Sequence, residues 1–241
     1  MKWTIVFTIL FLPELGQAQG LRKLESIGLV FSPGISYRTL NYSSSIQWVA
    51  SLRNNEELPA FGFMAGATIH YRLTNRLKIE TGILYSDMGI QTRFKDLTWV
   101  TPDEGFPIRT KTVFHYGSIR APIKVNYQLF EHNKLKLYAV MGLSTNVFIN
   151  KRTKVVTEYP DGHSSSHTSS KHAGYSIFGV DLIVGTSVEY QVSKRIYFRL
   201  EPNLNYAMTS AAVDKSSREY FFSFGIMAGA FYRIGMKAST H

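Results

Sequence analysis

The most constraining feature of this sequence is an alternation of apolar and polar residues over Ser118–Leu129, which reads SIRAPIKVNYQL. Ile119 and Ile123 fall on one parity, whereas Arg120 and Lys124 fall on the other. Side chains of a β-strand point alternately to its two faces. This period of two therefore predicts a strand with one apolar side and one polar side.

The same alternation recurs along the chain and predicts eight strands. They are Ile27–Tyr37, Ala60–Arg72, Leu77–Gly89, Val113–Leu129, Leu135–Ile149, Tyr175–Val192, Ile196–Met208 and Glu219–Ile234. Strands of membrane barrels carry apolar side chains toward lipid and polar ones toward the interior. The pattern predicts an all-β fold, an eight-stranded antiparallel up-and-down transmembrane β-barrel.

The connections between these strands alternate between short and long. The long ones are Arg38–Pro59, Ile90–Thr112, Asn150–Gly174 and Thr209–Arg218. Outer-membrane barrels have short periplasmic turns and longer external loops. We therefore expect an outer-membrane protein with both termini in the periplasm.

Outward-facing tyrosines are predicted at both ends of the strands, where an aromatic ring can bury its body and keep its hydroxyl in water. One set is Tyr71, Tyr127, Tyr190 and Tyr232, and the other is Tyr37, Tyr85, Tyr206 and Tyr220. These positions agree with the membrane-spanning interpretation.

The chain begins with a basic residue, Lys2, an apolar run over Trp3–Leu12, and a small-residue site at Gly16-Gln17-Ala18. This pattern is typical of a cleaved signal peptide, and the run is too short for a membrane-spanning helix. We expect a signal peptide over residues 1–18 and an outer-membrane β-barrel domain over residues 19–241.

Composition excludes several kinds of site. The chain has no cysteine, so it has no disulfide and no thiolate metal site. The formal net charge is +10, but the lysines and arginines are spread over turns, loops and strands rather than gathered on one face. We expect no nucleic-acid partner and no cofactor, and we expect contact with outer-membrane lipid and lipopolysaccharide.

Three prolines lie inside predicted strands, at Pro33, Pro122 and Pro202. Proline has no N–H to donate to a neighbouring strand, and a closed barrel offers no free edge. We expect bulges or local register changes at these positions.

Three segments carry a resemblance to a known family: Gly28–Arg38 (GLVFSPGISYR), Ile119–Tyr127 (IRAPIKVNY) and Arg199–Tyr206 (RLEPNLNY). The mature chain resembles the PorT-like outer-membrane β-barrel proteins of Gram-negative, Bacteroidetes-type bacteria. The resemblance implies a barrel and, by analogy, an accessory role in secretion. The chain departs from many outer-membrane proteins because Arg233–His241 follows its last aromatic residues.

Charged side chains on the inward parity are expected to pair with one another, because an unpaired enclosed charge costs several kcal/mol. Tight turns would place Glu189 opposite Arg199, and His70 opposite Glu80. The expected polar network of the interior, structural in role, is His70, Arg72, Lys78, Glu80, Arg120, Lys124, Glu189, Arg199 and Glu201.

No catalytic residue is predicted. Asp87, His115 and Asp181 fall at a similar height by strand position, but their spacing matches no nucleophile with its base. We expect that the protein is not an enzyme.

Possible contact residues of the long connections are Trp48, Trp99, His163, His167 and His172. Histidine clusters can bind zinc or copper. The three histidines lie in a serine-rich run, which favours a flexible hydrated loop without a metal.

Three functions remain open. The first is a non-enzymatic surface protein whose barrel is an anchor and whose long external loops contact a partner. The second is a secretion accessory or narrow transport barrel, as the PorT-like resemblance implies. The third is a soluble lipocalin-like carrier, in which the apolar parity would face inward.

Overall fold

The structure is a computed structural model that describes residues 23–44, 47–101, 103, 105–171, 177–212 and 217–234. The predicted signal peptide at residues 1–18 lies outside the described residues, and so does His172.

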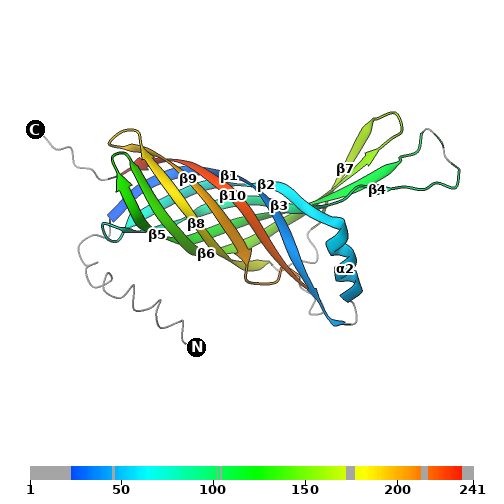
Figure 1. Ribbon diagram of the computed structural model, residues 1–241, viewed down its shortest axis with the longest axis horizontal. Coiled ribbons are helices and arrows are strands. Elements are labelled where there is room, and N and C mark those ends of the chain that lie inside the picture. Colours follow the sequence, from blue (N-terminus) through cyan, green and yellow to red (C-terminus); the bar gives the residue numbers. More distant parts are fainter. Residues whose placement is uncertain are drawn as a thin grey trace, which may run out of the picture.

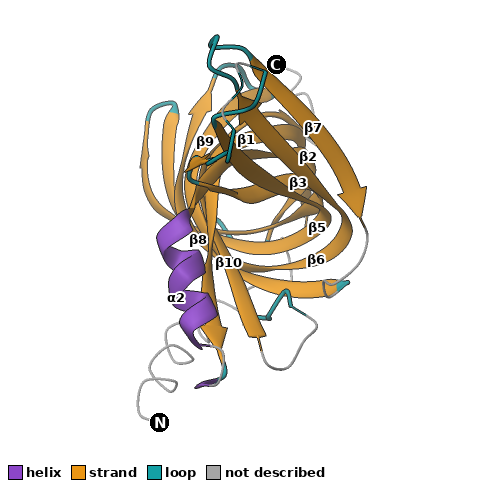
Figure 2. Ribbon diagram, turned by 90° about the vertical axis from the view of Figure 1, so that its right-hand side faces the viewer, coloured by secondary structure: helices purple, strands orange, loops and turns teal. Residues whose placement is uncertain are grey.

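Eight long strands close into a single antiparallel barrel, seen from the side in Figure 1 and as a ring in Figure 2. They are β1 (Lys23–Tyr42), β2 (Glu57–Arg72), β3 (Leu77–Thr92), β5 (Arg109–His132), β6 (Leu135–Glu158), β8 (Phe178–Gln191), β9 (Ile196–Ala207) and β10 (Ser217–Arg233). Each strand pairs with the next in this order, and β10 returns to pair with β1. The predicted fold class is confirmed.

The two faces of the strands differ as the sequence pattern predicts. Apolar side chains on the outside are widely exposed, with Phe61 at 80% and Ile123 at 62% of their full accessible area. Charged side chains on the inside are buried, with Lys124 at 1% and Glu201 at 0%. A lipocalin-like carrier needs the opposite arrangement. That alternative is therefore wrong.

The three strand prolines do not shift the register. Pro33 lies opposite Phe63, and Pro202 lies opposite Ile226, each within an unbroken register. Pro122 lies opposite Ser144 in the same way. The expected bulges at these prolines are wrong, because the missing N–H of a strand residue affects only one of its two neighbouring strands. Hydrogen bonds to the other neighbouring strand keep the residues in register.

A helix was not predicted within the first long connection. Helix α2 (Gln47–Glu56) packs its buried Ala50 against Leu40 and Tyr42 at the end of β1. Figure 1 shows α2 beside the barrel at the end that carries the long connections. No helix in the described part of the chain is long and apolar enough to cross a membrane.

The serine- and histidine-rich connection forms a hairpin, so the expectation of a flexible loop is wrong. Strand β6 continues past the barrel to Glu158, and β7 (Ser164–Lys171) pairs with this extension in antiparallel register. A tight turn joins them, with Gly162 at a φ of 81° and the Tyr159 N–H donating to the His163 carbonyl at 2.9 Å. The Asp-Gly pair at the turn is a hairpin signal. A two-residue strand, β4 (Lys95–Asp96), pairs with Arg109 and Thr110 at the start of β5.

Candidate functional site

The interior near the short turns is filled by a network of buried charges, centred on Glu80 of β3, Lys124 of β5, and Arg199 and Glu201 of β9. Lys124 Nζ lies 2.7 Å from Glu80 Oε1 and 2.9 Å from Glu201 Oε1. Arg199 Nη1 lies 2.8 Å from Glu80 Oε2, and Arg199 also pairs with Glu201. Each cation thus contacts both carboxylates. This arrangement offsets the cost of enclosing four charges.

His70 extends this network toward β1 and β10. Its Nε2 lies 3.1 Å from Glu80 Oε2 and 3.0 Å from Arg199 Nη1. Its Nδ1 lies 2.8 Å from the Tyr197 hydroxyl, and its ring stacks on Phe231 at a centroid distance of 4.7 Å. The imidazole is fully buried and has neighbours on every side, so its surroundings hold it in one orientation.

A second cluster lies closer to the short turns. Lys78 Nζ is 3.1 Å from Glu189 Oε2 and 3.2 Å from Glu25 Oε1, and it lies 4.7 Å from the ring centroid of Tyr138. Arg72 Nη2 is 2.7 Å from Glu25 Oε1. Sequence reasoning missed Glu25, because the first predicted strand began at Ile27, whereas β1 begins at Lys23 and a register shift between Leu24 and Ser26 turns Glu25 to the interior. A bulge reverses the parity that a strict alternation assigns.

The predicted cross-strand positions occur, but the ion pairs run differently. Glu189 lies opposite Arg199, and His70 lies opposite Glu80. The Glu189 carboxylate, however, pairs with Lys78 from the far wall, whereas Arg199 pairs with Glu80 and Glu201. The expected direct pair between Glu189 and Arg199 is wrong. In a barrel this narrow, long side chains can reach across the interior instead of sideways.

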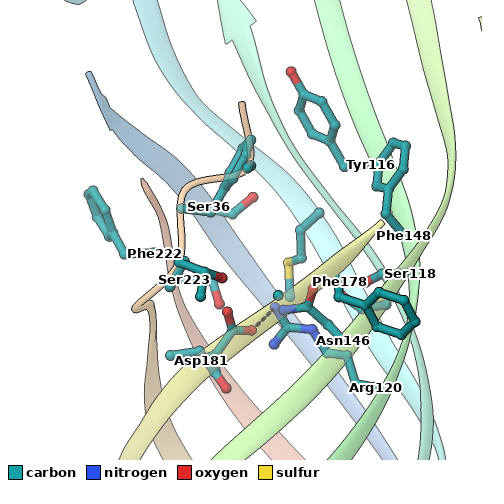
Figure 3. A pocket seen from close by; sticks show the side chains of 18 of the residues that line it. Ser36, Tyr116, Ser118, Arg120, Asn146, Phe148, Phe178, Asp181, Phe222 and Ser223 are labelled. Atoms are coloured by element: carbon teal, nitrogen blue, oxygen red, sulfur yellow. Dashed lines mark ion pairs between the residues drawn. The ribbon is translucent and has the colours of Figure 1, made fainter. Parts of the chain in front are cut away.

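Arg120 stands apart from both clusters, in the half of the barrel nearer the long connections. Its Nη2 lies 2.6 Å from Asp181 Oδ2 (Figure 3). Asp181 faces the interior, whereas Asp87 and His115 face outward on the parity of Ile119, with 3.4 Å between Asp87 Oδ1 and His115 Nδ1. These three possible catalytic residues are therefore divided between the two faces of the wall.

A cavity of about 90 Å³ lies at the level of the Arg120–Asp181 pair (Figure 3). Serines and Asn146 line it together with the aromatic rings of Tyr116, Phe148 and Phe221. Farther in, beside Arg120 and Lys124, only about 10 Å³ of free space remains in the next cavity. The interior is thus open in the half nearer the long connections and filled by side chains in the half nearer the short turns.

A buried cluster at the rim fixes α2 to the barrel. Arg38 is 1% exposed, with its Nη2 at 2.5 Å from Glu57 Oε1 and its Nη1 at 2.6 Å from Glu219 Oε2. Arg53 of α2 reaches the same two carboxylates at 3.0 and 3.1 Å. The sequence assigned Arg38 and Glu57 to a loop because strand alternation becomes irregular there. No signal predicted that they would meet Glu219.

The possible contact residues lie apart from one another. Trp48 is 68% exposed on α2. Trp99 is in the connection between β4 and β5, where its Nε1 donates to the Pro107 carbonyl at 2.7 Å. His163 and His167 are exposed on the β6–β7 hairpin. Within the described ranges, no group of three histidine, aspartate or glutamate side chains could hold a metal ion.

Residues 17–211 match a family model described as the outer membrane protein beta-barrel domain. The chain belongs to this family. It is an outer-membrane β-barrel, and lipid surrounds its apolar outer face. No curated protein matches the sequence.

Several solved structures are similar to the chain. Neisserial surface protein A is 16% identical with a TM-score of 0.39, over 86% of this chain and 97% of that chain. Ail, the attachment invasion locus protein of Yersinia pestis, is 16% identical with a TM-score of 0.31, over 86% and 98%. OprG of Pseudomonas aeruginosa is 9% identical with a TM-score of 0.48, over 90% and 99%.

The cross-barrel pairing of Lys78 with Glu189 can be measured by a double-mutant cycle. Lys78→Met and Glu189→Gln should each lower the free energy of unfolding by about 1–3 kcal/mol, because Lys78→Met removes the cation paired with Glu189 and Glu189→Gln leaves Lys78 with Glu25 as its one paired carboxylate among the described residues. The double variant should recover part of the summed loss. Urea unfolding in lipid vesicles gives these values.

A matched cycle of Glu189→Gln with Asp181→Asn is the control, because these carboxylates belong to separate clusters. The two changes should add. Additive losses for Lys78 and Glu189 as well would show that the two side chains do not interact.

Proposed function

We propose that this outer-membrane barrel is a non-enzymatic surface protein, in which the barrel is the anchor and the long connections contact a partner outside the cell. One observation carries the proposal. Ordered elements with exposed apolar side chains project from one end of a barrel whose interior is filled.

The projecting connection between β4 and β5 carries the strongest contact surface. Trp99, Phe106 and Ile108 are each more than two-fifths exposed, and Val100 is fully exposed. The Trp99 and Phe106 rings lie 5.0 Å apart. Large apolar side chains gathered on an aqueous surface indicate an interaction site, and tryptophan is frequent among residues that dominate binding.

The scaffold beneath these side chains is well connected. The Arg38 cluster joins α2 to β1, β2 and β10, and paired strands support the β6–β7 hairpin. A contact surface that is already ordered loses less conformational entropy on binding. This arrangement suits recognition by Trp48 on α2 and by the hairpin residues His163 and His167.

Absence of enzymatic activity is part of the proposal. Asp181 pairs with Arg120 inside the wall, whereas His115 and Asp87 lie outside it. Acid–base and nucleophilic groups must lie within hydrogen-bond reach of one another to act together. The divided placement of these groups supports a binding role.

The second candidate is a secretion accessory or narrow transport barrel of the PorT-like kind. The resemblance of Ile119–Tyr127 and Arg199–Tyr206 supports it, and these segments supply Lys124 and Arg199 of the interior network. The filled interior favours an accessory role over conduction.

The proposed orientation can be tested by cysteine labelling, since the natural chain contains no cysteine. Val100→Cys and Ser165→Cys should react with a membrane-impermeant maleimide on intact cells, because both lie on projecting elements. Ser193→Cys and Asn133→Cys, in the short turns, should react only after the outer membrane is permeabilised. Labelling of the short turns alone on intact cells would contradict the proposal.

The contact role can be tested at the same end. A photo-crosslinking residue in place of Val100 should give a discrete adduct with a cell-surface partner, and Trp99→Ala should weaken that adduct at least several-fold. The same residue in place of Val192, near a short turn, is the control. Equal adducts from both positions would contradict recognition by the long connections.

Conductance separates the two candidates. The purified barrel should show no steady ion current in a planar bilayer, because the ion pairs around Lys124 and Arg199 fill the interior. Stable openings of large conductance would favour transport and contradict the anchor proposal.

A further inference from the structure

Cations cluster on the outward face of β5 and β6 where these two strands run past the barrel, beyond their apolar surface. We call Arg109, Lys111, Arg152 and Lys154, together with His115, the outer basic patch. Three carboxylates lie among them: Asp87 and Glu158, which pair with Arg152 and Arg109, and Asp96, which lies opposite Arg109 on β4. The patch has four permanent cations against three anions. It is separate from the interior network and from the exposed apolar side chains around Trp99.

Strand register places the patch on the lipid-facing side. Tyr85 of β3 lies opposite Ile119 of β5, which lies opposite Val147 of β6, and these side chains share the outward parity. His115 keeps that parity because the β3–β5 register is constant from Ile119 back to it. It lies about 13 Å farther along the strand, at four residues of about 3.3 Å each. The patch therefore begins where the apolar surface ends.

Neighbouring residues keep the patch together. Arg152 lies opposite His115, and Lys154 lies opposite Val113, so both point outward. Asp87 pairs with Arg152 and lies 3.4 Å from His115.

Asp87 lies opposite Gly117, and His115 lies opposite Gly89. The Asp87 carboxylate therefore reaches the imidazole diagonally, from β3 to β5.

Two lysines of the patch are available to bind an anionic ligand. Lys111 Nζ lies 4.9 Å from the ring centroid of Phe94 and forms no ion pair with the residues that the structure describes. Lys154 is exposed and forms no ion pair within the described ranges. Arg109 also lies over Phe94, at 4.8 Å, but its Nε is 2.5 Å from Glu158 Oε2. The patch can therefore accept anionic groups without losing its internal pairs.

We infer that the outer basic patch binds the phosphate groups of lipid A in the outer leaflet. Arginine and lysine bind phosphate oxygens through charge-assisted hydrogen bonds. The apolar surface directly below, at Ile119 and Val147, contacts the acyl chains of the same molecule. A bound lipid A would thus meet apolar side chains along its chains and cations at its headgroup. The inference rests on the proposed external position of the long connections.

The test measures lipid retained by the purified full-length barrel in native mass spectrometry. Lipid A with two phosphates is compared with its one-phosphate form, with phosphatidylglycerol and with phosphatidylethanolamine. The test variant is Lys111→Gln with Lys154→Gln. The matched control is Lys134→Gln with Lys194→Gln, which removes the same charge from exposed residues at the short turns.

Retention should fall in the order two phosphates, one phosphate, then phosphatidylethanolamine. The test variant should bind lipid A roughly 5- to 30-fold more weakly, since each cation near a charged lipid surface contributes about fivefold. The control should bind as the natural chain does. Glu158→Gln should strengthen binding, because it removes a competing carboxylate from Arg109.

Four outcomes would overturn the inference. They are equal loss in the test variant and the control, equal retention of phosphatidylethanolamine, displacement of lipid A by inorganic phosphate at matched concentration, and preference for phosphatidylglycerol over lipid A. Cysteine labelling of intact cells is independent of these measurements, so a failure of the lipid site and a failure of the proposed orientation are distinguishable.

Discussion

The structure depends on the pairing of charges inside a barrel that is too narrow to hydrate them. Lys124 and Arg199 each bind both Glu80 and Glu201, and these four residues come from three strands. A shift of one strand by one residue would move its charges into lipid and leave their partners unpaired, at a cost of several kcal/mol each. The network therefore fixes strand register as well as filling the interior.

A filled interior leaves the two ends and the outer face as the surfaces where the protein can act. The Arg38 cluster at the rim turns one end into a rigid support for α2, and the extension of β6 supports a hairpin. Lipid contacts the remaining wall, and the chain presents cations where that wall leaves the apolar region. The anchoring, recognition and lipid binding that we propose thus fall on separate parts of one small fold.

The strands and much of their register follow from the sequence, because period-two alternation and tight turns are local signals. Long-range features do not. Glu25 needs a bulge to face inward, and Glu189 reaches across the barrel to Lys78 instead of pairing with its neighbour Arg199. The hairpin at Gly162 had a local Asp-Gly signal, but the serines and histidines around it favoured the interpretation as a flexible loop. A contact surface of the kind we propose leaves no comparable pattern, since it depends on which exposed side chains meet in space.

The central claim is that the apolar parity faces lipid and the polar parity faces a closed interior. Single spin labels on cysteines along β5 test it most directly, in lipid vesicles, with oxygen as a lipid-soluble relaxant. Labels at Ile119, Ile123 and Val125 should show high oxygen accessibility, and labels at Ser118 and Asn126 should show low accessibility. Equal accessibility at all five positions, or maxima at Ser118 and Asn126, would contradict the account.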